Sequence, residues 1–159
     1  GDGKMITGVV KITDNKVNRV GGTDLVQGGI YYFSEDSGSS KGQMETGKTT
    51  YDDDGEDVHY YFKKNGQAYT NAYVKGCIYD EYGKRVDAED GSKYMLYTVL
   101  DNIYTDGNTA QAPVITAGTQ VVVNTSGTVK KSGTVEVDGI KYEIGKTNAY
   151  EATVKPSQD

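Results

Sequence analysis

The tripeptide Tyr-Tyr-Phe occurs twice in this chain, at 31–33 and again at 60–62, 29 residues later. A glycine and a similar short segment follow each copy, "GQMETG" at 42–47 and "GQAYTN" at 66–71. Similar segments at a regular spacing indicate a repeat architecture, in which each unit buries one face on its neighbours. The chain is therefore predicted to fold as an array of repeats.

Short segments of alternating polarity predict strands. In "VHYYF" at 58–62, alternate residues fall on opposite faces, which places His59 and Tyr61 together on one face. The turn "KKNG" at 63–66 follows, and "QAYT" at 67–70 returns as the second strand of a hairpin. No window shows a sustained helical period, and 21 glycines interrupt the chain. The expected fold is all-β.

The segment "TVEVDGIKYEI" at 134–144 predicts a second hairpin with an Asp138–Gly139 turn. The two-residue loop fixes the register, because a slip by one residue would move every apolar side chain to the wrong face. The predicted cross-strand pairs are Val137 with Ile140, Glu136 with Lys141, and Val135 with Tyr142.

Further units follow the same order of aromatic strand, glycine turn and short strand. They lie at 1–12 (the second half of a unit), 77–94 and 121–142, whereas 95–120 fits least well and is an insertion or a degenerate unit. A lone hairpin is marginally stable, so we expect the hairpins to stack into a β-solenoid-like array. The predicted organisation is repeats over 1–94, the irregular segment 95–120, and a further hairpin repeat with a C-terminal tail over 121–159.

The composition limits the kind of partner. The chain has 14 tyrosines, no tryptophan and a net charge of −6. Tyrosines can supply much of the buried area of a thin core, and the negative charge argues against nucleic acid as a partner. No apolar run is long enough to span a membrane. The array begins in the middle of a repeat, so two copies could form a homodimer through the exposed end.

The segments "GDGKMITGVVKI", "GGIYYFSEDSGSSKGQMETG" and "HYYFKKNGQAYTN" resemble the cell-wall-binding repeats of Gram-positive surface proteins. That family includes choline-binding modules, glucan-binding repeats and the repetitive domains of large clostridial toxins. The resemblance covers 1–12 and 29–94, and in part 121–144. It implies a solenoid of β-hairpins that attaches a secreted protein to cell-wall polymers or other glycans.

The chain departs from the choline-binding type at four positions. That type would carry Trp before the paired tyrosines and after "TG", whereas this chain has Ile30, His59, Val9 and Lys48 there. Tryptophan offers the best face for cation–π attraction, and a lysine would repel a cationic ligand. Choline binding is therefore not carried over from the resemblance.

Tyrosine rings can stack on the apolar face of a sugar while hydroxyls and carboxylates bind its edges. The candidate ligand-binding residues are Tyr32, Tyr61, Tyr69, Tyr73 and His59. The alternative is that these tyrosines form the core between repeats and place only their hydroxyls at the surface.

Catalysis and metal binding receive little support from the sequence. His59 is the single histidine, and the single cysteine, Cys77, is 18 residues away with no local sign of activation. The acidic segment "YDDDGED" at 51–57 lacks the spacing of a calcium loop, so a solvated turn is the better interpretation. No catalytic residue, cofactor or metal site is predicted.

The sequence thus predicts a non-catalytic module that binds cell-wall polymer or another glycan and belongs to a secreted or surface-attached bacterial protein. Its expected location is extracellular or attached to the cell wall. Two alternatives stay open. The chain could be a structural spacer without a ligand, or the attachment region of an enzyme or toxin whose catalytic part lies outside it.

Overall fold

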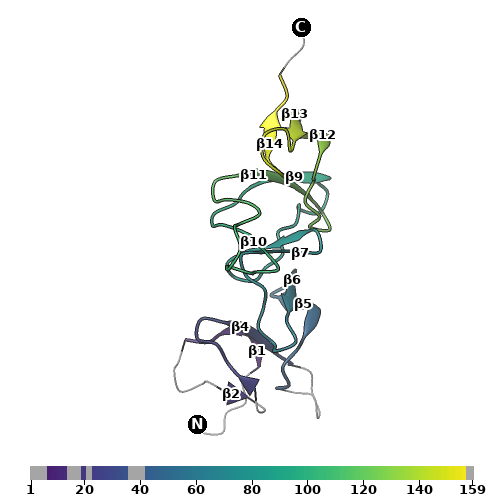
Figure 1. Cartoon of the computed structure of the whole chain (residues 1–159). Helices are drawn as coiled ribbons and strands as arrows, with labels where there is room; N and C mark the ends of the chain where they lie inside the picture. Colours follow the sequence, from purple (N-terminus) through teal and green to yellow (C-terminus); the bar gives the residue numbers. More distant parts are fainter. Residues whose placement is uncertain (1–6, 14–18, 21–22, 36–41, 157–159) are drawn as a thin grey trace. The chain divides into compact units, whose positions relative to one another are not determined.

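The computed structural model describes residues 7–13, 19–20, 23–35 and 42–156. These residues form fourteen short strands and no helix, arranged in small two- and three-stranded sheets (Figure 1). The described part of the chain accordingly contains no helix that could span a membrane. The prediction of an all-β fold built from hairpins is confirmed for these residues.

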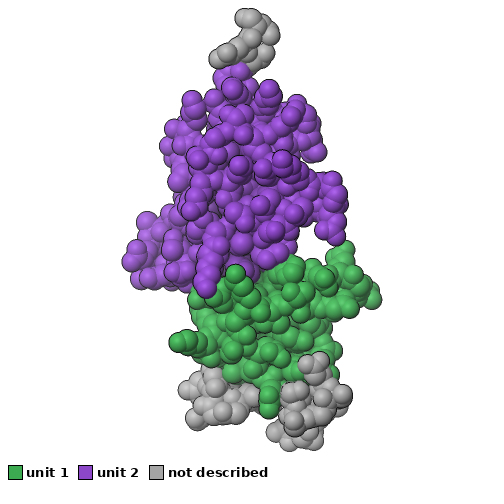
Figure 2. All heavy atoms as spheres, turned by 90° about the vertical axis from the view of Figure 1, so that its right-hand side faces the viewer, with its two compact units in different colours: residues 1–69, 82–84 green, residues 70–81, 85–159 purple. Residues whose placement is uncertain are grey.

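The chain divides into two compact units, which Figure 2 distinguishes by colour. The first unit comprises Gly1–Tyr69 together with Tyr82–Lys84. The second unit comprises Thr70–Glu81 together with Arg85–Asp159. The first unit therefore includes three residues, Tyr82–Lys84, from a turn that lies further along the sequence.

The strands of the first unit pair as antiparallel ladders. They are β1 (Gly8–Lys11), β2 (Arg19–Val20), β3 (Thr23–Asp24), β4 (Ile30–Phe33), β5 (Gly47–Asp53) and β6 (Glu56–Phe62). β1 pairs with β4, β2 with β3, and β5 with β6. Part of the first predicted repeat, residues 1–6, lies outside the described residues.

The two Tyr-Tyr-Phe copies adopt the same arrangement. In β4, Tyr31 and Phe33 are buried, with ring centroids 6.5 Å apart and planes at 26°. In β6, Tyr60 and Phe62 are buried in the same way, at 5.6 Å and 22°. The middle tyrosine of each copy is half-buried, as expected for alternate faces of a strand. The predicted alternation in 58–62 is confirmed.

The principal partner of β6 differs from the predicted one. The returning segment 67–70 makes a single bridge, between Phe62 and Ala68, and the Tyr69 N–H donates to the Tyr61 carbonyl oxygen at 2.9 Å. The long ladder of β6 is instead with the preceding strand β5, over seven residue pairs. The sequence analysis assigned no strand to β5, because its lysine, threonines and aspartates give it no apolar face.

One turn recurs at four places in the part of the chain that the structure describes. In each copy a strand residue bridges to a residue that stands two positions after a glycine. The bridges are Phe33–Met44, Phe62–Ala68, Tyr79–Arg85 and Val123–Val129, and the glycines are Gly42, Gly66, Gly83 and Gly127, with φ between 80° and 89°. In the last three copies the bridging residue comes six positions after the strand residue. Glycine adopts this left-handed conformation without steric cost.

Three of these glycines also lie against the bridging residue of the preceding turn. A Cβ at Gly83 would be 3.2 Å from the Cβ of Ala68 and 3.3 Å from the ring of Tyr60. The two corresponding contacts are of Gly66 with the side chain of Met44, and of Gly127 with the side chain of Arg85. Glycine is therefore required both for the backbone angle and for the close approach of successive turns.

The second unit contains eight strands. They are β7 (Ala72–Val74), β8 (Cys77–Tyr79), β9 (Tyr94–Thr98), β10 (Tyr104–Thr105), β11 (Gln120–Asn124), β12 (Gly133–Val137), β13 (Ile140–Ile144) and β14 (Ala152–Val154). β7 lies between β8 and β10, and the pairing with β10 is parallel. β9 pairs with β11, and β12, β13 and β14 form an antiparallel sheet.

The hairpin of β12 and β13 has the predicted register at all three pairs. Its turn residues Asp138 and Gly139 have φ of 50° and 82°, as a two-residue hairpin loop requires. Val137 is buried, but its partner Ile140 is 47% exposed, because it directly follows the turn at the end of the hairpin.

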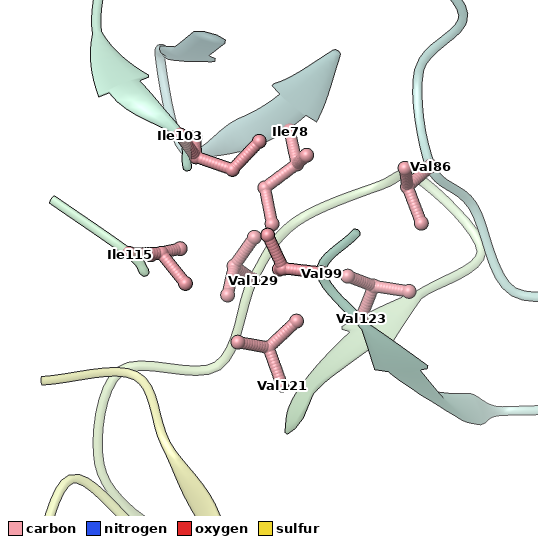
Figure 3. Packing of buried hydrophobic residues seen from close by; sticks show 8 residues of the cluster. All are labelled: Ile78, Val86, Val99, Ile103, Ile115, Val121, Val123 and Val129. Carbon is pink, nitrogen blue, oxygen red and sulfur yellow. The ribbon is translucent and has the colours of Figure 1, made fainter. Parts of the chain in front are cut away.

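The main core of the second unit is built from valine and isoleucine. Eight buried residues form this cluster (Figure 3): Ile78, Val86, Val99, Ile103, Ile115, Val121, Val123 and Val129. A second cluster joins Val122 to the buried face of the sheet of β12, β13 and β14. The segment 95–120 contributes several of these core residues, and its interpretation as an insertion or a degenerate repeat stays a prediction.

Candidate functional site

The first unit contains a pocket of about 300 Å³. Three strands of this unit, β1, β4 and β6, and the turn at 82–84 border the pocket. The lining residues are Val9, Val10 and Lys11 of β1, Ile30 of β4, Tyr60 of β6, and Tyr82 and Lys84 of the turn. The volume lies at the lower end of the range for small-molecule sites in proteins.

The pocket combines apolar surface with a few polar groups. Ile30 and Tyr60 are almost completely buried, whereas Tyr82 is 57% exposed. Lys11 is exposed and Lys84 is half-buried. Apolar and aromatic walls with a few hydrogen-bonding groups are the usual composition of sites that bind small organic ligands.

Two of the positions at which the choline-binding type carries Trp line this pocket. They are Val9 and Ile30, both aliphatic here. Neither position carries an aromatic ring, and two lysines line the same space.

Tyr61 and Tyr69, two of the predicted site residues, lie together. Their rings are 5.2 Å apart and meet edge to face at 84°. The ammonium of Lys48 is 5.9 Å from the ring centroid of Tyr61, and that of Lys63 is 5.3 Å from the centroid of Tyr69. Each ring thus already interacts with a cation, which leaves less of its surface for a stacked ligand.

His59 lies beside this pair on the same face of β6. Its Nδ1 atom is 3.0 Å from Oγ1 of Thr50, the residue opposite on β5. Cys77 belongs to the second unit, where its thiol faces the carbonyl oxygen of Ser126 at 3.7 Å. His59 and Cys77 therefore belong to different units.

The acidic segment 51–57 forms the turn of the hairpin of β5 and β6. A carboxylate oxygen of Asp52 accepts a hydrogen bond from the Gly55 N–H at 2.8 Å. Within the described ranges, no group of three or more His, Cys, Asp or Glu side chains is arranged to hold a metal ion. The carboxylate of Asp52 is used to close the turn.

Tyr32 lies in a different aromatic group from Tyr61. Its ring meets that of Tyr51 edge to face at 5.2 Å and 69°. A hydrogen bond with Glu35 raises the pKa of the Tyr51 hydroxyl above its usual value, and burial raises this pKa further. Tyr51 and Glu35 were not predicted as site residues, although a tyrosine paired with a carboxylate is a common polar contact for sugars.

Tyr73 lies in the second unit, apart from the other predicted residues. Its ring is 5.1 Å from that of Tyr150 and packs against the valine and isoleucine cluster. Its hydroxyl is buried and makes no hydrogen bond of normal geometry. Burial raises the pKa of Tyr73, and the adjacent Tyr150 hydroxyl raises it further. These contacts favour a role for Tyr73 in packing.

The structure therefore brings together only part of the predicted site, and it adds residues that the sequence analysis missed. The missed residues line the pocket: Tyr60, Tyr82, Lys11 and Lys84. A signal for Tyr82 was present in the sequence, because this tyrosine directly precedes the glycine of the third recurring turn. Nothing in the sequence pattern indicated the two lysines.

Comparison with solved structures gives a weak likeness, whereas comparison with families and curated sequences gives none. No family model matches the chain, and no curated protein sequence matches it. Among solved structures, the chain is similar to part of alternansucrase in complex with isomaltononaose, with a TM-score of 0.29 and 15% sequence identity. The likeness covers 92% of this chain but only 9% of that enzyme's chain. Similarity at this level carries no argument about fold or function.

Proposed function

We propose that this chain is a non-catalytic carbohydrate-binding module. The observation that carries the proposal is the pocket of the first unit, with its apolar walls, its two tyrosines and its hydrogen-bonding groups. A pyranose ring has apolar C–H faces and a rim of hydroxyls, so it needs both kinds of contact. Tyr82, which is 57% exposed, offers ring surface for a face, and the phenol and ammonium groups can bind the hydroxyls.

The proposal includes a repeat architecture in which successive hairpin turns stack. Its support is the recurring turn, whose glycine approaches the bridging residue of the preceding turn in three places. When turns stack in this way, similar shallow sites recur at intervals along the chain. Weak sites in series raise the overall affinity through effective concentration, provided that one polymer can reach several of them.

We further propose that the module belongs to a secreted or surface-attached bacterial protein and binds cell-wall polymer or a related glycan. This part of the proposal rests on the resemblance of the repeated segments to cell-wall-binding repeats. Within the module, the half-buried His59 contacts Thr50, a partner typical of a structural role.

The test is to measure sugar binding after removal of the exposed tyrosine, with the variant Tyr82→Ala. Tyr82 is 57% exposed, so the fold should tolerate the change while the pocket loses an aromatic wall. Leu100→Ala is the control, because Leu100 is a large apolar residue that is 72% exposed and lies in the other unit. The readouts are retention on isolated cell walls and tyrosine fluorescence during titration with soluble oligosaccharides, free of any tryptophan signal.

We expect retention to weaken by up to roughly tenfold for Tyr82→Ala and not to change for Leu100→Ala, since loss of one aromatic stacking contact costs about 0.5–1.5 kcal/mol. A second candidate is a structural spacer, favoured by the burial of both rings that stack in each Tyr-Tyr-Phe copy. If the unaltered chain is retained on no wall preparation and binds no sugar, the spacer is the better account.

A further inference from the structure

We infer that the pocket of the first unit selects an acidic sugar, one that carries a carboxylate or a phosphate group. This inference rests on the proposed function and specifies the ligand class of the same pocket. It follows from three features of the lining: the sign of its charge, the partly apolar surroundings of that charge, and the aromatic surface beside it.

The charge of the lining is opposite to that of the chain. The whole chain has 23 acidic and 17 basic side chains, and a net charge of −6. Among the described residues the pocket reverses this balance, because those that line it include Lys11 and Lys84 and no aspartate or glutamate. Two positive charges in the wall of one pocket favour an anionic ligand over a neutral or cationic one.

The position of these lysines strengthens their effect on a ligand. Ile30 and Tyr60, both almost completely buried, form part of the same wall. Apolar groups exclude water from that side of the pocket, so the attraction between an ammonium and an anion is screened less than on an open surface. Lysine recognises phosphate and carboxylate groups as a compact charge with three donors, without the fixed bidentate geometry of arginine.

The aromatic surface indicates that the anionic group is attached to a sugar ring. A bare phosphate or carboxylate would contact the lysines and leave the ring of Tyr82 and the side chain of Val9 unused. A charged sugar uses both parts, because its ring covers the apolar wall while its acidic group reaches the ammonium groups. The inferred ligand class is therefore a uronic acid or a phosphorylated sugar within a polymer.

The experiment compares three probes of similar length on the unaltered chain: neutral isomaltononaose, an oligogalacturonate and a phosphorylated oligosaccharide. Affinity is measured by tyrosine fluorescence and calorimetry, at low and at physiological salt. The variants are Lys11→Gln and Lys84→Gln, which keep length and polarity but remove the charge. Lys64→Gln is the matched control, because Lys64 is an exposed lysine of the same unit that does not line the pocket.

We expect at least one acidic probe to bind roughly tenfold more tightly than isomaltononaose. The reason is that one hydrogen bond to a charged group raises the affinity by about a factor of ten. Lys11→Gln and Lys84→Gln should each remove most of this preference, leave isomaltononaose binding unchanged and weaken the salt dependence. Lys64→Gln should change nothing. The carboxylate and phosphate probes then identify which of the two groups the pocket prefers.

Two results would overturn the inference while the proposed function stands. One is equal binding of neutral and acidic probes with no effect of the lysine variants. The other is an acidic preference that Lys64→Gln reduces as much as Lys84→Gln does, which would show attraction by general surface charge. Failure of all three probes to bind would instead overturn the proposed function, and the acidic preference with it.

Discussion

The cores of the two units are built from different side chains. In the first unit half of the buried residues in the two described core clusters are aromatic, and Tyr31, Phe33, Tyr60 and Phe62 are the largest of them. In the second unit the main cluster is entirely valine and isoleucine. Tyrosine carries a polar hydroxyl that needs water or a partner, whereas valine and isoleucine carry none. In the first unit the hydroxyl of Tyr31 accepts a hydrogen bond from the Val26 N–H at 2.9 Å, and Tyr60 is part of the pocket lining.

This difference explains where the candidate binding surfaces lie. The pocket and the pair of Tyr61 with Tyr69 all belong to the first unit. In the second unit the one predicted site residue, Tyr73, packs against the aliphatic cluster. The comparison teaches that the side chains that fill a hairpin unit decide whether a tyrosine lines a candidate pocket or packs in an aliphatic core.

The largest expected effect comes from removing a core ring of the first unit. Phe62→Ala should lower the free energy of unfolding by about 3–5 kcal/mol, because it leaves a large cavity. Phe62 is 1% exposed. The control is Tyr61→Ala, which removes a half-buried ring from the opposite face of the same strand and should cost about 1 kcal/mol or less. Urea denaturation followed by circular dichroism measures both.

The result can contradict the comparison directly. If Phe62→Ala and Tyr61→Ala lower the free energy of unfolding equally, the two faces of β6 do not differ, and the first unit lacks the aromatic core described above. A cost of less than 1 kcal/mol for Phe62→Ala would lead to the same conclusion.

A smaller effect is expected from the glycine that joins successive turns. Gly83→Ala places a Cβ 3.2 Å from Ala68 and 3.3 Å from the ring of Tyr60, at a φ of +82°. Gly118→Ala introduces a similar backbone strain, at a φ of +90°, but its Cβ would have no neighbour within 4 Å. The left-handed conformation costs a non-glycine residue about 1–2 kcal/mol. The crowding at Gly83 should add about 1 kcal/mol more.

Thermal or urea unfolding of the two alanine variants measures the difference between them. An equal loss of stability would show that only the backbone angle matters, and that the turns do not approach closely at Gly83. That outcome would remove the main support for stacked repeats in the first unit, while the pocket would remain.

The sequence predicted the local features of this fold well. The pairing of Val135 with Tyr142 was predictable because an Asp-Gly turn fixes the register of a hairpin, and the apolar face then follows by alternation. The alternating burial of 58–62 was predictable for the same reason. β5 was not, since a strand without an apolar face carries no periodic signal and is defined only by its partner.

The candidate site was less predictable, because a pocket depends on residues that are distant in the sequence. Lys11 and Lys84 belong to segments 73 residues apart and meet only through the packing of the first unit. The pairing of Tyr61 with Tyr69 was predictable from the local turn between them. That of Tyr32 with Tyr51 was not, because it depends on how one hairpin packs on the next.

The smallest expected effect concerns one pair of charged residues that face each other across the hairpin of each unit. In the first unit Asp52 lies opposite Asp57, whereas in the second unit Glu136 lies opposite Lys141. Charges of opposite sign that face each other across a ladder raise the free energy of unfolding by about 0.2–1 kcal/mol, whereas like charges lower it. Asp57→Lys should therefore raise stability by this amount, and Lys141→Glu should lower it. Both differences should shrink in high salt, because the pairs are exposed and screened. Unfolding curves at low and high salt that show the same sign for both variants would contradict the contrast between the two hairpins.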